Sequence, residues 1–185
     1  MRPDEWSRGP LILVGVGHQA TPLDVREHLA LSADVWRQLA PASVPNVLLS
    51  TCSRVDVYGW ADEHPLRCAR ELGRALARAA NTPARKLEPF LVTETGSQAL
   101  LHLVRVASGL DSLVVGEEQI RGQVRAAFRE AVASTVLPAP LVGIFERALQ
   151  AARDIRVETP LRAAPVDCIG ERRGRPARSG AGRRS

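Results

Sequence analysis

The chain has 185 residues, of which 45% are apolar, 24% charged and 4% aromatic, so it suits one or two compact domains and excludes a fibre or a wholly disordered chain. Its formal net charge of +5 suggests a nucleic-acid partner, but residues 1–160 hold 18 basic and 18 acidic residues. The whole excess of positive charge lies in residues 161–185, which hold seven arginines and only two acidic residues, Asp167 and Glu171. The overall charge therefore says nothing about what the rest of the chain binds.

The first half of the chain alternates predicted strands and helices. Apolar, β-branched or aromatic runs predict strands at 11–16, 47–50, 55–60 and 87–92, and apolar spacing predicts helices at 22–31, 32–39 and 64–80. Ser32 is the expected N-cap of the second helix, and Pro83 ends the third. The order β, α, β, β, α, β predicts a split βαβ, ferredoxin-like sheet with helices on one face.

From Thr95 onward the expected structure is helical. Thr95 and Gln98 form a predicted capping box for a helix that ends at Gly109, and two further helices are expected at about 113–133 and 141–158. The tail after Leu161 has the Arg, Gly, Pro, Ala and Ser composition of a disordered segment. The predicted fold class is therefore α+β: a ferredoxin-like βαββαβ sheet subdomain, a helical subdomain and a disordered C-terminal tail. The predicted boundary separates a folded domain at 1–160 from the tail at 161–185.

The sequence shows no membrane span or export signal. Its longest apolar stretch, 99–116, is broken by His102, Arg105 and Asp111, and so falls short of the ~18 uninterrupted residues of a membrane span. Two acidic residues in the first ten, and a short apolar run after them, are unlike a signal peptide. The expected location is the cytoplasm.

The three cysteines, Cys52, Cys68 and Cys168, are odd in number and widely spaced, which argues against a disulfide framework and a cysteine zinc site. Cys52 lies between two predicted strands, where a side chain is presented on a rigid edge. Arg54 and the adjacent hydroxyls would favour its thiolate, the form that acts as a nucleophile. The alternative from local sequence is a small buried residue at a strand end. Cys68 is expected in the core.

Two further features have both a functional and a structural interpretation. His102 flanks the apolar stripe of its helix, where it either approaches a site or is an ordinary structural histidine, and it is too isolated to indicate a metal site. A set of small and polar residues would share one helical face, suited to binding a substrate or simply solvated. The members of this set are Ser112, Gly116, Gln119 and Gln123.

Three longer motifs carry a family resemblance by their order and spacing. They are Gly15–Pro22 (GVGHQATP), Leu49–Tyr58 (LSTCSRVDVY) and His102–Ile120 (HLVRVASGLDSLVVGEEQI). Together they strongly resemble the N-terminal catalytic domain of glutamyl-tRNA reductase, over about residues 11–159. That family uses NADPH to reduce glutamyl-tRNA to glutamate 1-semialdehyde, the first committed step of the five-carbon route to tetrapyrroles such as porphyrin and heme.

The resemblance implies a role for each matching residue. Cys52 would attack the ester that joins glutamate to the tRNA 3′ end and form a thioester, and Arg54 would pair with a substrate carboxylate. His102 would be a second catalytic residue, in proton transfer or in positioning the ester. The implied substrate-binding residues are Thr51, Cys52, Ser53, Arg54, Ser112, Glu117, Glu118, Gln119 and Gln123. No residue is expected to bind a metal.

The sequence departs from the family pattern at three of these motif positions. Ser53 replaces the usual asparagine, Val55 the usual threonine, and Glu118 a common proline. The change at Ser53 removes an amide beside the nucleophile, so we expect it to weaken recognition of glutamate.

No site for NADPH is predicted in this chain. The family continues into a glycine-rich NADPH-binding domain and a dimerising helix, which this sequence lacks, and Gly15 and Gly17 have no third glycine at the spacing of a dinucleotide loop. We therefore expect a truncated enzyme that cannot complete the hydride step or form the family's homodimer through that helix. Back-translating 166–176 with one nucleotide dropped yields a Ser- and Ala-rich peptide resembling the family's next segment, which predicts a frameshift or sequencing error.

The expected partners are glutamyl-tRNA(Glu) as substrate and, as in the family, the downstream aminomutase, with no membrane. An alternative is a non-catalytic module that binds tRNA or a protein partner, and a third interpretation is a redox-sensing thiol. Replacing Cys52 with serine separates them, because an enzyme loses ester cleavage and a binding module loses nothing.

Overall fold

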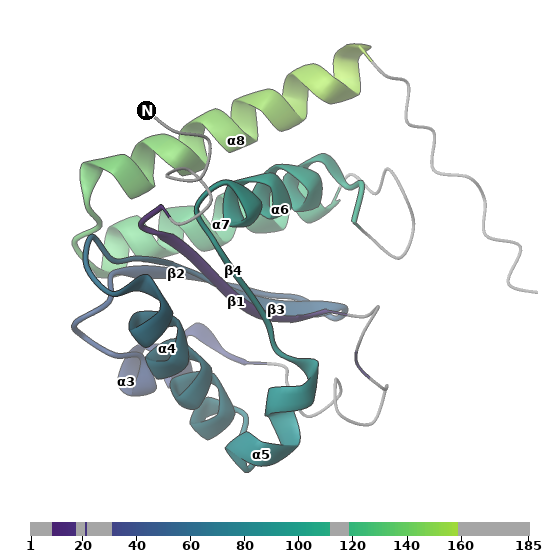
Figure 1. Ribbon diagram of the computed structural model, residues 1–185. Helices are drawn as coiled ribbons and strands as arrows, with labels where there is room; N and C mark the ends of the chain where they lie inside the picture. The colour runs from purple at the N-terminus through teal and green to yellow at the C-terminus, as the bar shows by residue number, and fades with distance from the viewer. Residues whose placement is uncertain (1–8, 18–20, 22–30, 112–118, 159–185) are drawn as a thin grey trace, which may run out of the picture.

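The structure is a computed structural model, which describes residues 9–17, 21, 31–111 and 119–158 (Figure 1). The helix expected at 22–31, the start of the one expected at 113–133, and the tail at 161–185 therefore lie outside the described residues. None of the helices in these described ranges is long and apolar enough to cross a bilayer.

Four strands form an antiparallel sheet: β1 (Leu11–Gly17), β2 (Asn46–Ser50), β3 (Arg54–Trp60) and β4 (Val92–Thr95). Their spatial order is β2-β3-β1-β4, so the first and third strands are central and the second and fourth are edges. The central register runs from Leu11 opposite Trp60 to Gly17 opposite Arg54. This is the ferredoxin-like arrangement expected from the order of elements, and that prediction is confirmed.

The fourth strand begins later than predicted. The segment predicted as a strand at 87–92 is mostly α5 (Ala84–Leu87) and a 3-10 turn, η1 (Glu88–Phe90). Leu87 is fully buried in the core, where it packs as part of a helical turn and not of a strand. Pro89 lies at the start of the 3-10 turn. A short apolar run does not by itself distinguish a strand from a buried helical turn.

Helices cover both faces of the sheet. The helices of the ferredoxin-like unit, α3 (Ala33–Leu39) and α4 (Pro65–Ala79), pack on one face as predicted, and α6 (Gly96–Ser108), α7 (Gln119–Ser134) and α8 (Ala139–Glu158) pack on the other (Figure 1). Side chains of β1 alternate between the two cores: Ile12, Val14 and Val16 contact the first, and Leu11 and Leu13 the second. The later helices thus share a core with the sheet.

The predicted helix ends at Ser32 and Gly109 form as expected. The Ser32 hydroxyl accepts a hydrogen bond from the backbone N–H of Val35 at 3.3 Å and caps α3, and Gly109 ends α6 with φ of 76°. The capping box predicted from Thr95 does not form, because its side chain makes no capping bond. The chain instead enters α6 through Gly96, whose φ of 59° departs from the helical geometry of a capping box.

Candidate active site

Cys52 lies at the tip of the turn that joins β2 to β3, and its side chain is exposed. The Thr51 hydroxyl accepts hydrogen bonds from the backbone N–H groups of Ser53 and Arg54, each at 3.2 Å. The Thr51 N–H donates to the Arg54 carbonyl at 2.9 Å and closes the turn. The alternative of a buried cysteine at a strand end is therefore wrong: the thiol is presented to solvent on a turn held by Thr51.

The alternation of side chains along β3 divides this strand between two environments. Val55 and Val57 point into the core beneath α3 and α4. Arg54, Asp56 and Tyr58 lie on the opposite face, toward α6. A strand with a period of two thus carries an apolar row and a polar row, and the polar row begins two residues after Cys52.

Arg54 is turned into the domain, with only 3% of its side chain exposed. Its Nη1 lies 3.4 Å from the Asp56 carboxylate, and its Nη2 lies 3.7 Å from the Asp111 carboxylate and donates to the Asp111 backbone carbonyl. These contacts compensate a guanidinium that would otherwise be costly to bury. A substrate carboxylate that pairs with Arg54 would have to share it with these two aspartates.

His102, on α6, lies between β3 and Asp111. Its Nδ1 is 2.9 Å from the Tyr58 hydroxyl, and its Nε2 is 3.9 Å from the Asp111 carboxylate, which also contacts Arg105 at 3.4 Å. Burial lowers the pKa of His102 below its ordinary value, although the Asp56 carboxylate opposes this shift. His102 therefore favours its neutral form near neutral pH.

Burial also changes the pKa of two groups on β3. It raises the pKa of Tyr58 well above its usual range, and the negative charge of Asp56 adds to this shift. It raises the pKa of Asp56 too, against the favourable influence of His102 and Arg54. Both shifts follow from the cost of placing a negative charge in a site with little access to water.

Residues of β1, β3, β4 and α6, together with Asp111, surround a cavity of about 310 Å³. Its polar and glycine lining consists of Gly15, Gly17, Arg54, Asp56, Glu94, Gln98, His102, Arg105 and Asp111. Gly15 is needed for close approach, because a Cβ there would lie 2.2 Å from Oδ1 of Asp56. The cavity therefore has charges of both signs on its walls and a neutral histidine.

The remaining predicted site residues are not all brought to this cavity. Cys52 does not line it, but lies on the adjacent turn, two residues from Arg54. Gln119 and Gln123 share one exposed face at the start of α7, as predicted, and neither lines the cavity. Ser112, Glu117 and Glu118 lie outside the described residues.

Five residues of the site were not predicted from the sequence: Asp56, Tyr58, Glu94, Arg105 and Asp111. A signal existed for the first two, because the period of two along β3 places Asp56 and Tyr58 beside Arg54. Asp111 had no such signal, since it meets Arg54 only through the packing of the chain after α6 against the sheet.

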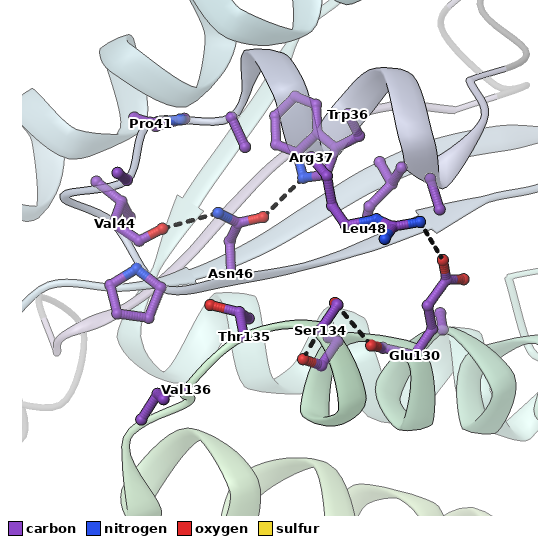
Figure 2. A pocket seen from close by; sticks show the side chains of 16 residues that line it. Trp36, Arg37, Pro41, Val44, Asn46, Leu48, Glu130, Ser134, Thr135 and Val136 are labelled. Atoms are coloured by element: carbon purple, nitrogen blue, oxygen red, sulfur yellow. Dashed lines mark hydrogen bonds and ion pairs between the residues drawn. The ribbon is translucent and has the colours of Figure 1, made fainter.

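A second cavity, of about 330 Å³, lies between α3, the edge strand β2 and α7 (Figure 2). The indole N–H of Trp36 donates to the Asn46 side-chain carbonyl at 2.7 Å, and Arg37 reaches across to Glu130 at 3.8 Å. The two cavities are nearly equal in size, so volume does not decide between them. Only the first combines a histidine, buried charges and a neighbouring exposed thiol, and it is the better candidate.

The described residues offer no fit to a metal or a dinucleotide. No group of three or more His, Cys, Asp or Glu in these ranges is placed to hold a metal ion. All described neighbours in the sheet are antiparallel, so this part of the chain has no two adjacent parallel strands joined by a helix, the unit whose glycine-rich turn binds a pyrophosphate.

The fold and site define a ferredoxin-like α+β domain that carries a cysteine at a hairpin tip beside a buried cluster of His, Arg and Asp. Residues 14–159 match the family model described as the N-terminal domain of glutamyl-tRNA(Glu) reductase. The chain belongs to the glutamyl-tRNA reductase family, matching its N-terminal domain.

Individual relatives agree with this assignment. The chain is 39% identical to glutamyl-tRNA reductase from Alcanivorax borkumensis, over 84% of its own length and 38% of the relative's, and 41% identical to that from Syntrophus aciditrophicus, over 80% and 37%. The solved structure of glutamyl-tRNA reductase from Methanopyrus kandleri matches with a TM-score of 0.64 and 29% identity, over 82% of this chain and 35% of that one. The chain thus spans less than two fifths of the length of these relatives.

Proposed function

We propose that this chain carries out the acyl-transfer half of glutamyl-tRNA reduction, in the route to tetrapyrroles, with Cys52 as the nucleophile. The observation that carries the proposal is the position of Cys52: exposed, on a turn held by Thr51, and two residues before Arg54 enters the charged cavity. A nucleophile must be reachable by a large substrate and still be fixed relative to the groups that bind it, and this turn meets both needs.

The proposed step exchanges an ester for a thioester. Sγ of Cys52 bonds to the ester carbonyl carbon of glutamyl-tRNA, and the bond from that carbon to the terminal ribose oxygen breaks. The ribose oxygen gains one proton, and the thiol loses one. The products are a glutamyl thioester on Cys52 and free tRNA.

The charges of the cavity suit a glutamyl group. That group carries an ammonium and a carboxylate, and the cavity walls carry Arg54 and Arg105 together with Asp56, Asp111 and Glu94. The exposed Arg105, whose side chain is 52% accessible, can turn to a new carboxylate at a smaller desolvation cost than the buried Arg54. We therefore expect Arg105 to supply part of the carboxylate recognition first expected of Arg54.

In the family, NADPH supplies the hydride that reduces the thioester to glutamate 1-semialdehyde. Because the described residues do not fit a dinucleotide, we expect this chain to stop at the thioester or to hydrolyse it. The family's aminomutase partner, a cytoplasmic location and a domain boundary at residue 160 stay predictions.

Incubation with glutamyl-tRNA labelled in the glutamate tests the proposal. We expect the label to become attached to the wild-type protein in a form that hydroxylamine releases, with free tRNA as the second product. Cys52→Ser should slow release of free tRNA by about a thousandfold or more. Cys68→Ser is the matched control, since Cys68 packs against the core beneath α3 and α4.

Two results would contradict the proposal. Cleavage of glutamyl-tRNA by Cys52→Ser at the wild-type rate would exclude this nucleophile. Binding of tRNA without cleavage by the wild-type chain would favour the non-catalytic binding module. Formation of the semialdehyde after addition of NADPH would overturn the narrower expectation that the reaction stops at the thioester.

A further inference from the structure

The Tyr58 hydroxyl and His102 form a buried contact that joins the sheet to α6. The hydroxyl oxygen lies 2.9 Å from Nδ1 of His102, and Tyr58 is completely buried. The phenol ring packs edge-on against Phe145 of α8, with ring centroids 5.6 Å apart. Tyr58 of β3 thus packs against α6 and α8, and these contacts fix the direction of its hydroxyl.

The surroundings determine which of the two groups donates. Within the described residues the Tyr58 hydroxyl has no hydrogen-bond partner besides Nδ1, so its proton is satisfied only if the tyrosine donates. The other ring nitrogen, Nε2, faces the Asp111 carboxylate at 3.9 Å, which favours a proton on Nε2. The high pKa of Tyr58 and the low pKa of His102 agree with a protonated phenol beside a neutral imidazole.

We propose that Tyr58 is a positioning residue that holds His102 as the Nε2–H tautomer, so that His102 acts as a hydrogen-bond donor into the cavity and not as the base for Cys52. This inference rests on the proposed function for its catalytic part. A neutral imidazole whose Nδ1 is occupied by Tyr58 and whose Nε2 carries a proton has no free nitrogen to accept the thiol proton. It can donate from Nε2 to the ester carbonyl oxygen, where negative charge develops during attack by the thiol.

The tautomer can be measured without substrate. Long-range ¹H–¹⁵N correlation spectra of histidine-labelled protein at slightly alkaline pH separate protonated from unprotonated ring nitrogens, and His102→Gln assigns the signal among the four histidines. We expect a protonated Nε2 and an unprotonated, hydrogen-bonded Nδ1 in the wild type. In Tyr58→Phe the Nδ1 resonance should move toward that of an unbonded nitrogen. A proton on Nδ1 in the wild type, or an unchanged Nδ1 resonance in Tyr58→Phe, would overturn the proposal.

Kinetics test the catalytic part. Tyr58→Phe should lower the single-turnover rate of ester cleavage about tenfold while the half-saturating tRNA concentration stays within about twofold, since the lost contact touches His102 and not tRNA. Ser108→Ala is the matched control: it removes another buried hydroxyl of the same region, one that donates to the Val104 carbonyl at 2.7 Å, and should keep the wild-type rate.

The outcomes separate this inference from the proposed function. Equal rates for Tyr58→Phe and Ser108→Ala would overturn the role of Tyr58, while loss of cleavage in Cys52→Ser would still support Cys52. The expected spectra in a wild-type protein that cleaves no ester would confirm the tautomer and contradict the proposed function.

Discussion

The two faces of the sheet differ in how the side chains buried on them are stabilised. Beneath α3 and α4, β3 contributes Val55 and Val57 to a core cluster of apolar side chains. Toward α6, the same strand contributes Arg54, Asp56 and Tyr58, which are just as deeply buried but are held by ion pairs and hydrogen bonds. Burial of apolar area stabilises the first face and also the core beneath α6, α7 and α8, whereas Arg54, Asp56 and the Tyr58 hydroxyl each depend on a particular neighbour.

The two faces therefore contribute differently to the stability and to the chemistry of the domain. The apolar face tolerates imperfect packing at the cost of stability alone. On the polar face the loss of one partner leaves a buried charge uncompensated, so stability and chemistry change together. The following variants test this difference between the two faces.

The largest expected effect comes from Arg54→Leu, which leaves the buried Asp56 carboxylate without its partner. We expect the free energy of unfolding at neutral pH to fall by about 3–5 kcal/mol. The double variant Arg54→Leu/Asp56→Leu should recover much of this loss, because it removes the uncompensated charge as well. Urea unfolding of the single and double variants measures both values, and equal losses would contradict the pairing.

The matched variant on the apolar face is Leu72→Ala, since Leu72 is fully buried in the core beneath α4. It should lose about 2–5 kcal/mol through its cavity. The loss in Arg54→Leu should shrink as the pH falls, because burial raises the pKa of Asp56 and the folded chain takes up the proton before the unfolded chain does. The loss in Leu72→Ala should not depend on pH, and a common pH dependence of the two losses would erase the contrast between the faces.

A smaller effect is expected at Gly15. An added methyl group would lie 2.2 Å from Oδ1 of Asp56 and 3.1 Å from the Val55 carbonyl oxygen, so Gly15→Ala should cost about 1–3 kcal/mol and displace Asp56 from Arg54. Gly17→Ala, on the same strand, is the control because its Cβ would meet nothing within 4 Å. Thermal unfolding that ranks the two variants equally would count against a role for Gly15 in close packing.

The smallest effect is the pH dependence that His102 confers. Because burial lowers its pKa, the unfolded chain binds a proton at higher pH than the folded chain does, and stability is lost as the pH falls below about 6.5 toward the lowered value. His102→Gln should remove this contribution, so the difference in unfolding free energy between wild type and variant should change over that window. A constant difference would show that the folded environment leaves the pKa of His102 unshifted.

Much of the architecture could be predicted because it depends on local patterns. The three apolar runs and the helix at 64–80 appear nearly where expected. The Ser32 hydroxyl caps the start of α3, and Gly109 ends α6 through its left-handed backbone conformation. The error at 87–92 occurred where a short apolar run suits either a strand or a buried helical turn. The unbroken apolar run of β1 also indicates that both faces of the sheet are covered, since a strand with one solvated face would alternate apolar and polar residues.

The candidate site divides in the same way. Cys52 between two strands, and the motifs that indicate the family, could be read directly from the chain. The partners of Arg54 and His102 could not, because Asp111 is 57 positions from Arg54 and Tyr58 is 44 positions from His102. Contacts at such separations depend on how α6 lies against the sheet, which no local pattern specifies.

Local sequence patterns were thus enough to predict most of the strands and helices in order, the family resemblance and the position of Cys52 between two strands. Whether its thiol is buried or exposed followed only from the folded structure. Three features depend on tertiary packing: helices cover both faces of the sheet, Arg54 is turned inward between two aspartates, and Tyr58 contacts one nitrogen of His102. The physical reason is that secondary structure follows the spacing of neighbouring residues, whereas a buried charge or hydroxyl takes its partner from whichever element packs against it.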